Sequence, residues 1–335
     1  MDNIRYLPLH QLCTHMKSIL LINNPSEIGA GTRGASLGFE ALQIAGWKKE
    51  NPLLNSFERV DVQDNNHAMY SADVNPHAHR IKPICEVFER TGEALKKAFD
   101  SNKFPLVIGG DHSVAAGTIS GIKKAHSDKR LGVVWIDAHA DLHTPYTTPS
   151  GNIHGMPLAI ALSEDNLEER KNVPVEQTIQ EWNDAKSIFG IAPKINHDDL
   201  VFFGLRDTEA EEDAIIARHG IRNFSVDEVR SSSVSATVDE ACDRLKDCDI
   251  VYISFDVDSM DPELVSHGTG TPVPHGFSPH EAVSMIKLLF ERLPVCCFEM
   301  VEINPTLDEK GNEMAEVAFD ILEQVKGFIE QSISS

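Results

Sequence analysis

At 335 residues the chain is long enough for one large α/β domain or two ordinary ones, and its apolar share of 41% supports a substantial core. Asp and Glu outnumber Lys and Arg by 52 to 30, and the net charge of -22 argues against nucleic acid and anionic membrane surfaces as partners. The six cysteines show no CxxC spacing, and we expect reduced core thiols at Cys13, Cys85, Cys242, Cys248, Cys296 and Cys297.

The start of the chain, MDNIRYLPLHQLCTHMK, lacks the apolar segment of a secretory signal, and no apolar run approaches membrane-spanning length. These features favour a cytoplasmic enzyme. No repeat, low-complexity tract or linker divides the sequence, so we expect a single domain over residues 1–335.

Apolar runs alternate with helical patterns along the whole chain. Strands are predicted at 18–22, 57–62, 104–108, 131–136, 200–205, 250–255 and 294–303. The clearest helical patterns cover 39–45, 81–99, 115–126 and 313–333. Most of the strands are continuously apolar, which indicates burial on both faces and therefore a mainly parallel sheet covered by helices.

Gly29, Gly31 and Gly34 spell GxGxxG, the spacing of a dinucleotide-binding turn. The polar stretch 23–27 separates these glycines from the preceding strand, and no acidic residue stands in NPLLN at 51–55, where the ribose would be bound. We therefore expect a loop that faces the substrate or another subunit.

Metal-type ligands follow the ends of several predicted strands. Asp137, His139 and Asp141 alternate after the run 131–136, a spacing that directs side chains of an extended chain to one face. Strand ends elsewhere deliver further acids and an imidazole, namely His112, Asp256, Asp258 and Glu302. Because ligands bind beyond the carboxyl ends of parallel strands, these residues can meet at one edge of the sheet.

Without Glu302, this set comprises two imidazoles and four aspartates. It is too rich in carboxylates for a structural zinc site and too large for one ion with an open position. Two ions bridged by aspartates fit better, and oxygen-dominated ligation favours Mn²⁺, with Fe²⁺ or Co²⁺ as alternatives. Such ions lower the pKa of a shared water, which predicts metal-activated hydrolysis.

The motifs GGDHS, DAHADLHTP, TPSGNIHG, SFDVDSMDP, GTGTP and EINP resemble those of the ureohydrolase superfamily, and of its arginase branch in particular. The resemblance extends from IGAGTRGASLG to EINP. It implies a three-layer α/β/α fold on an eight-stranded parallel sheet, with the active site at the carboxyl ends of the strands. It also implies a dinuclear manganese centre, hydrolysis of L-arginine to L-ornithine and urea, and a homotrimer or hexamer.

The resemblance assigns roles to individual residues. One manganese ion matches His112, Asp137, Asp141 and Asp256, and the other matches Asp137, His139, Asp256 and Asp258. The implied catalytic residues are His154, which shuttles a proton, Glu302, which engages the guanidinium, and Asp141. The implied substrate-binding residues are His143, Ser150, Asn152, Glu209, Glu212 and Thr271, and all of these except Thr271 match positions at the amino acid end of the substrate.

The sequence departs from the arginase pattern at two of these positions, with His143 in place of an asparagine and Glu209 in place of an aspartate. The loop 266–275 is also one residue longer than the usual arginase loop and adds His267 and His275, which are expected at the surface. An agmatinase or another guanidino-acid amidinohydrolase with the same metal centre is therefore the alternative function. A formiminoglutamase and a catalytically silent arginine sensor fit the motifs less well.

Overall fold

The computed structural model describes residues 18–334, so the expectations for the first 17 residues and for Cys13 lie outside the described part. Its centre is an eight-stranded sheet in which every pairing is parallel. In chain order the strands are β1 Ser18–Asn24, β2 Glu58–Asp61, β3 Lys103–Gly109, β4 Leu131–Ile136, β5 Leu200–Phe203, β6 Arg222–Phe224, β7 Ile250–Asp256 and β8 Val295–Val301.

The spatial order of the strands is β2-β1-β3-β8-β7-β4-β5-β6. The chain leaves a gap between β3 and β4 and fills it last, with β7 and β8. Consequently, β3, β8, β7 and β4 are the four central strands, and they are the strands whose ends carry the predicted ligands.

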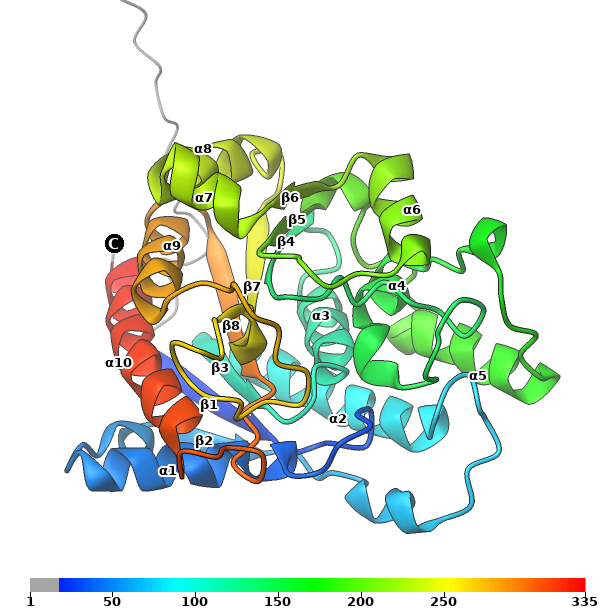
Figure 1. The fold of residues 1–335 in the computed structure, drawn as a ribbon, viewed down its shortest axis with the longest axis horizontal. Helices are drawn as coiled ribbons and strands as arrows, with labels where there is room; N and C mark the ends of the chain where they lie inside the picture. The colour runs from blue at the N-terminus through cyan, green and yellow to red at the C-terminus, as the bar shows by residue number, and fades with distance from the viewer. Residues whose placement is uncertain (1–17, 335) are drawn as a thin grey trace, which may run out of the picture.

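Helices cover both faces of the sheet, as Figure 1 shows. On one side α2 packs on α3 and α5, and α3 packs on α4; on the other, α1, α10, α9 and α8 pack in succession. The helices are α1 Gly38–Lys48, α2 Ile81–Asp100, α3 Val114–Ala125, α4 Pro157–Leu162, α5 Glu176–Lys186, α6 Ala210–His219, α7 Val226–Ser232, α8 Val234–Arg244, α9 Pro279–Arg292 and α10 Glu313–Ser334. The predicted three-layer α/β/α class is confirmed.

The core explains why the apolar runs became strands. Each residue of β4, β5, β7 and β8 is buried, because helices lie against both faces of these strands. The sequence prediction did not locate β6, an edge strand of three residues of which only Phe224 is buried. Too short and too polar to form an apolar run, it offers no signal above that of a loop.

The five cysteines in the described residues are reduced thiols, as expected. Cys248, Cys296 and Cys297 are buried, whereas Cys85 of α2 and Cys242 of α8 are only partly covered. No helix among residues 18–334 combines the length and apolar character needed to cross a membrane.

Candidate dinuclear metal site

His112 follows the end of β3, and its imidazole Nδ1 faces three carboxylates. The nitrogen lies 3.0 Å from Asp137 Oδ2 and 3.1 Å from Oδ2 of both Asp141 and Asp256. Although this nitrogen is buried, it forms no hydrogen bond of good geometry. A cation between the imidazole and the three anionic oxygens would satisfy all four groups.

The opposite side of the His112 ring is held in place by its neighbours. Its Nε2 lies 2.7 Å from Ser254 Oγ, and the ring stacks on Trp135 with the centroids 4.0 Å apart and the planes within 5°. The indole of Trp135 in turn donates a hydrogen bond of 2.9 Å to Asp137. These contacts fix the ring orientation, as supporting residues do around metal-binding histidines.

His139 faces a second pair of carboxylates. Its Nδ1 lies 3.0 Å from Asp258 Oδ2 and 3.5 Å from Asp137 Oδ1. Asp137 thus presents one oxygen to His112 and the other to His139, the position of a bridging carboxylate. The structure therefore brings together all six predicted metal ligands, in two clusters that share Asp137.

Burial makes this cluster electrostatically costly. Asp137, Asp256 and Asp258 are at most 2% exposed. Burial raises the pKa of Asp141 to about 6, with repulsion from Asp137 adding to the effect. Burial and the neighbouring aspartates also raise the pKa of Asp256 well above its ordinary value. Multivalent cations would remove this repulsion, so the donor set fits metal ions.

Two candidate site residues have strained backbones. Asp141 and Glu302 have φ values of 52° and 67°, in the left-handed region that side chains other than glycine rarely adopt. Such strain persists only where surrounding contacts enforce it, and it is concentrated at functional sites. Here it directs both carboxylates toward the cavity that they line.

Glu302 links the cluster to His154. Its Oε1 accepts a hydrogen bond of 2.8 Å from the backbone N–H of His112 and lies 3.4 Å from His154 Nδ1. Burial lowers the pKa of His154, but the Glu302 carboxylate more than offsets this and raises the pKa to about 9. The imidazole therefore holds a proton beside the cluster in the absence of metal.

The outer part of the cavity is acidic and contains His143. The imidazole Nε2 of His143 lies 3.1 Å from Glu209 Oε2 and 3.7 Å from Glu212 Oε2. Glu209 precedes α6, and its backbone N–H donates to the Glu212 carboxylate, so the start of the helix positions both acids. This side of the cavity is suited to an ammonium group.

These residues line one cavity of about 190 Å³. Asp137 is fully buried and does not border the cavity. All other predicted site residues border it: His112, His139, Asp141, His143, Ser150, Asn152, His154, Glu209, Glu212, Asp256, Asp258, Thr271 and Glu302. Thr271, predicted to contact substrate, borders this cavity, and its hydroxyl also donates a hydrogen bond of 3.1 Å to Asp258 Oδ2. In this structure the hydroxyl supports a candidate metal ligand.

The early glycines pack against the same site. The carbonyl of Gly29 accepts a hydrogen bond of 3.1 Å from the backbone N–H of His154. A Cβ on Gly31 would lie 2.9 Å from the Asn152 amide nitrogen. The GxGxxG loop therefore supports the segment that carries His154, which agrees with the prediction that it faces the substrate site. The added loop histidines, His267 and His275, are exposed as expected.

Sequence reasoning missed several residues around this site. Asp111 is fully buried, accepts the backbone N–H of Gly29, and has a pKa raised to about 6 by burial and Glu302. Asp207 Oδ2 lies 3.6 Å from His139 Nε2. Ser254 could have been found, because it precedes Asp256 by two residues on the same strand and shares its face.

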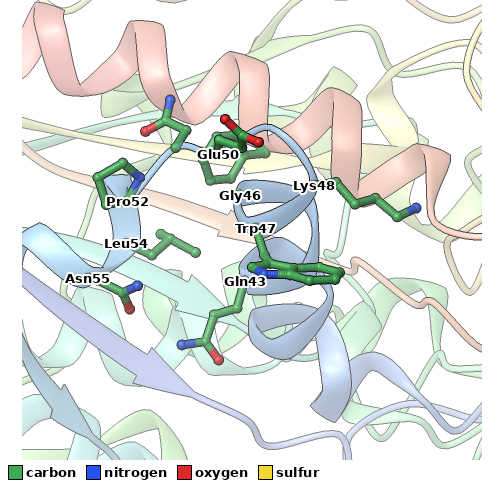
Figure 2. A pocket seen from close by; sticks show the side chains of 10 residues that line it. Gln43, Gly46, Trp47, Lys48, Glu50, Pro52, Leu54 and Asn55 are labelled. Atoms are coloured by element: carbon green, nitrogen blue, oxygen red, sulfur yellow. The ribbon is translucent and has the colours of Figure 1, made fainter.

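A larger cavity, of about 620 Å³, lies at the C-terminal end of α1 and borders Phe319 of α10. Figure 2 shows Trp47, Lys48 and Glu50 around it, with Leu54 and Asn55 on the following turn. Its lining contains no histidine, and Glu50 is its only carboxylate. This cavity therefore lacks the clustered ligands that catalysis would need.

A family model described as the arginase family matches residues 17–326. The chain belongs to the arginase family. An arginase from Bacillus subtilis (strain 168) is 33% identical over 319 residues, which cover 93% of this chain and 98% of that protein.

Solved structures give the same result for the arginase fold. The arginase from Bacillus caldovelox superposes with a TM-score of 0.79 at 32% identity, covering 93% of this chain and 99% of that one. The arginase from Entamoeba histolytica, solved in complex with L-ornithine, gives a TM-score of 0.78 at 26% identity, with coverage of 93% and 99%. The chain is therefore an arginase-type hydrolase.

Proposed function

We propose that this chain is a dinuclear manganese hydrolase that cleaves the guanidinium group of L-arginine to yield L-ornithine and urea. One observation carries most of the proposal: Asp137 presents its two oxygens to two different imidazoles, His112 and His139. Family membership and the L-ornithine bound to the Entamoeba histolytica relative support the same substrate.

The metal ligands proposed for one ion are His112, Asp137, Asp141 and Asp256, and those for the other are Asp137, His139, Asp256 and Asp258. Oxygen atoms dominate both sets, which favours Mn²⁺ over Zn²⁺. When bound, two such ions supply Lewis-acid charge that makes water a nucleophile near neutral pH. The buried carboxylates contribute negative charge that offsets that of the ions.

Glu302 is proposed to orient the guanidinium. Its carboxylate borders the cavity beside His154, and a planar guanidinium pairs well with a carboxylate in a fixed geometry. This contact retains the cation and keeps its central carbon electrophilic. His154 then donates a proton to the departing amine, a role that its contact with Glu302 prepares.

The polar rim is proposed to bind the amino acid end of the substrate. Glu209 and Glu212 are suited to the α-amino group, and His143 contacts both of them through Nε2 and Thr147 through Nδ1. Ser150 and Asn152 line the same cavity and can donate to the α-carboxylate. Thr271 borders the same cavity and is proposed to contact the substrate while its hydroxyl supports Asp258.

A second candidate function is hydrolysis of agmatine or another guanidino compound. The observation that favours it is the 3.1 Å contact between His143 and Glu209, at the two positions that depart from the arginase pattern. This contact pairs Glu209 with His143, and Glu209 would otherwise be available to bind the α-amino group of arginine. A guanidino acid that carries a carboxylate but no α-amino group would lose nothing from this arrangement, whereas agmatine keeps an amino group and depends on the same acids.

Urea release from L-arginine and from agmatine, measured with Mn²⁺, separates the two functions. We expect a higher kcat/KM for L-arginine, and faster agmatine turnover would overturn the proposal. His143→Asn should alter KM for arginine more than kcat, since this residue lies at the rim. Arginine binding without urea release would instead identify a sensor, and two equivalents of zinc in protein purified without added metal would contradict manganese.

We further propose a cytoplasmic homotrimer or hexamer in which residues 1–335 form one domain. Arginase-family membership supports the assembly, and the single eight-stranded sheet supports the domain assignment. Sedimentation equilibrium of the full chain tests the assembly. A mass close to 37.0 kDa would show a monomer and contradict the proposed trimer or hexamer.

A further inference from the structure

A second group of metal-type ligands lies outside the candidate active site. Glu164 Oε2 is 3.5 Å from His197 Nε2 and 3.7 Å from His219 Nε2. The three ligand atoms all lie within 4.8 Å of one another. None of these residues borders the catalytic cavity or appears in any motif used above.

The fold places this cluster at the opposite edge of the sheet. His197 lies in the short helical turn His197–Asp199 directly before β5, at the amino end of that strand. His219 is the last residue of α6, whose N-cap Glu209 borders the catalytic cavity. A ten-residue helix is about 15 Å long, so the two clusters are well separated.

The imidazole nitrogens that face Glu164 have no other partner. Nε2 of His197 and Nε2 of His219 are both buried atoms without a hydrogen bond. Within residues 18–334, no other ion pair involves either ring. Buried ring nitrogens normally have partners, so two unsatisfied ones beside the same carboxylate oxygen indicate a shared ligand.

Glu164 is oriented by its own loop. Its other oxygen, Oε1, accepts a hydrogen bond of 2.7 Å from the backbone N–H of Asn166. The Asn166 side chain is in turn held by Arg218 and by the carbonyl of Glu211. This contact leaves Oε2 free for the histidines, the arrangement expected around a metal-binding carboxylate.

We propose that Glu164, His197 and His219 form a further metal site, which takes Zn²⁺. Tetrahedral zinc with bonds of 2.0–2.1 Å separates its ligand atoms by about 3.3 Å, close to the two distances observed here. Two imidazoles and one carboxylate are a zinc-type set, and a solvent molecule completes the fourth position. The dinuclear site is oxygen-rich and favours manganese, so one chain would sort two metals by ligand type.

Binding requires one ring to turn. The two imidazoles stack with centroids 3.6 Å apart and planes within 9°, so their lone pairs do not converge on one point. The χ2 torsion of histidine is broad, and the His219 side chain is 30% exposed, so rotation about its Cβ–Cγ bond is accessible. Zinc binding therefore opens the stack and joins the end of α6 to the turn before β5.

The proposal is tested on full-length, manganese-loaded protein dialysed against micromolar Zn²⁺ in excess Mn²⁺, with both metals counted by mass spectrometry. Wild type should gain one zinc per chain, and His219→Gln and Glu164→Gln should gain none while retaining their manganese. The exposed His280 provides a matched control, and His280→Gln should bind zinc as wild type does.

A thermal unfolding series gives a second measurement. Zn²⁺ should raise the Tm of wild type and of His280→Gln, and this increase should be lost in the two cluster variants. If one cluster variant fails to fold, the other still tests the site. Equal zinc content in wild type and both variants, or a third equivalent of manganese in place of zinc, would overturn the proposal.

Discussion

Replacing Glu302 by glutamine should lower the pKa of His154 and remove a pH-dependent part of the stability. The Glu302 carboxylate, 3.4 Å from His154 Nδ1, is the main cause that raises the histidine pKa, from 6.5 to about 9. Glutamine keeps the shape but not the charge, so burial would then be opposed only by the weaker attraction of Asp111 and Asp141, and the pKa of His154 should fall.

The size of the effect follows from the two pKa values. A histidine whose pKa is raised in the folded state stabilises that state fully below pH 6.5 and ceases to do so as the pH rises through about 9. At about 1.36 kcal/mol per pKa unit, the contribution is on the order of 3 kcal/mol. Metal-free wild type should lose up to this amount of stability between pH 6 and pH 10, and Glu302→Gln should lose clearly less.

Urea denaturation of metal-free protein at a series of pH values measures the difference, and NMR titration of labelled histidines locates it. The control is Glu309→Gln, which removes a charge from an exposed position. It should behave as wild type. If the stability of Glu302→Gln varies with pH as steeply as that of wild type, or if the His154 pKa is unchanged, the assigned ion pair is not the cause.

Other substitutions test the site and its support. His154→Asn should reduce kcat by about 100-fold or more with a smaller change in KM, as expected for a proton donor; an unchanged rate would remove His154 from the mechanism. Asp137→Asn should reduce bound manganese below two ions per chain by elemental analysis, because this carboxylate faces both imidazoles. Gly110→Ala should lower the free energy of unfolding, measured by urea denaturation, by about 1–3 kcal/mol, because the added Cβ would lie 2.1 Å from the Ser26 carbonyl oxygen. Gly327→Ala meets no atom within 4 Å and should not destabilise the chain.

Much of the fold could be predicted because burial on both faces leaves a clear signal. The run 131–136 is apolar throughout and is the strand β4, with the same bounds. The order of the strands could not be predicted this way, since no local pattern states that β7 and β8 lie between β3 and β4. The eight-strand count came from family resemblance, and the single-domain assignment stays a prediction.

Part of the candidate site could likewise be predicted from the sequence, and part could not. Its ligands follow strands at regular spacings, so their convergence could be inferred from the chemistry of strand ends. The contact of Thr271 with Asp258 and the left-handed backbone of Asp141 depend on how loops return to the site, which spacing does not encode. The group Glu164, His197 and His219 was not found, because its members lie in three separate loops or helix ends with no shared motif.

Because β7 and β8 are synthesised last but lie at the centre of the sheet, the strand order determines when the metal site can form during translation. Until residues 250–301 have left the ribosome, β3 and β4 have no strands between them, and Asp256, Asp258 and Glu302 are missing. A nascent chain that ends before this point therefore has His112 on one side of the gap and Asp137 on the other. The metal centre can then form only after the chain has been synthesised through β8, so metal loading is expected to follow translation of all eight strands.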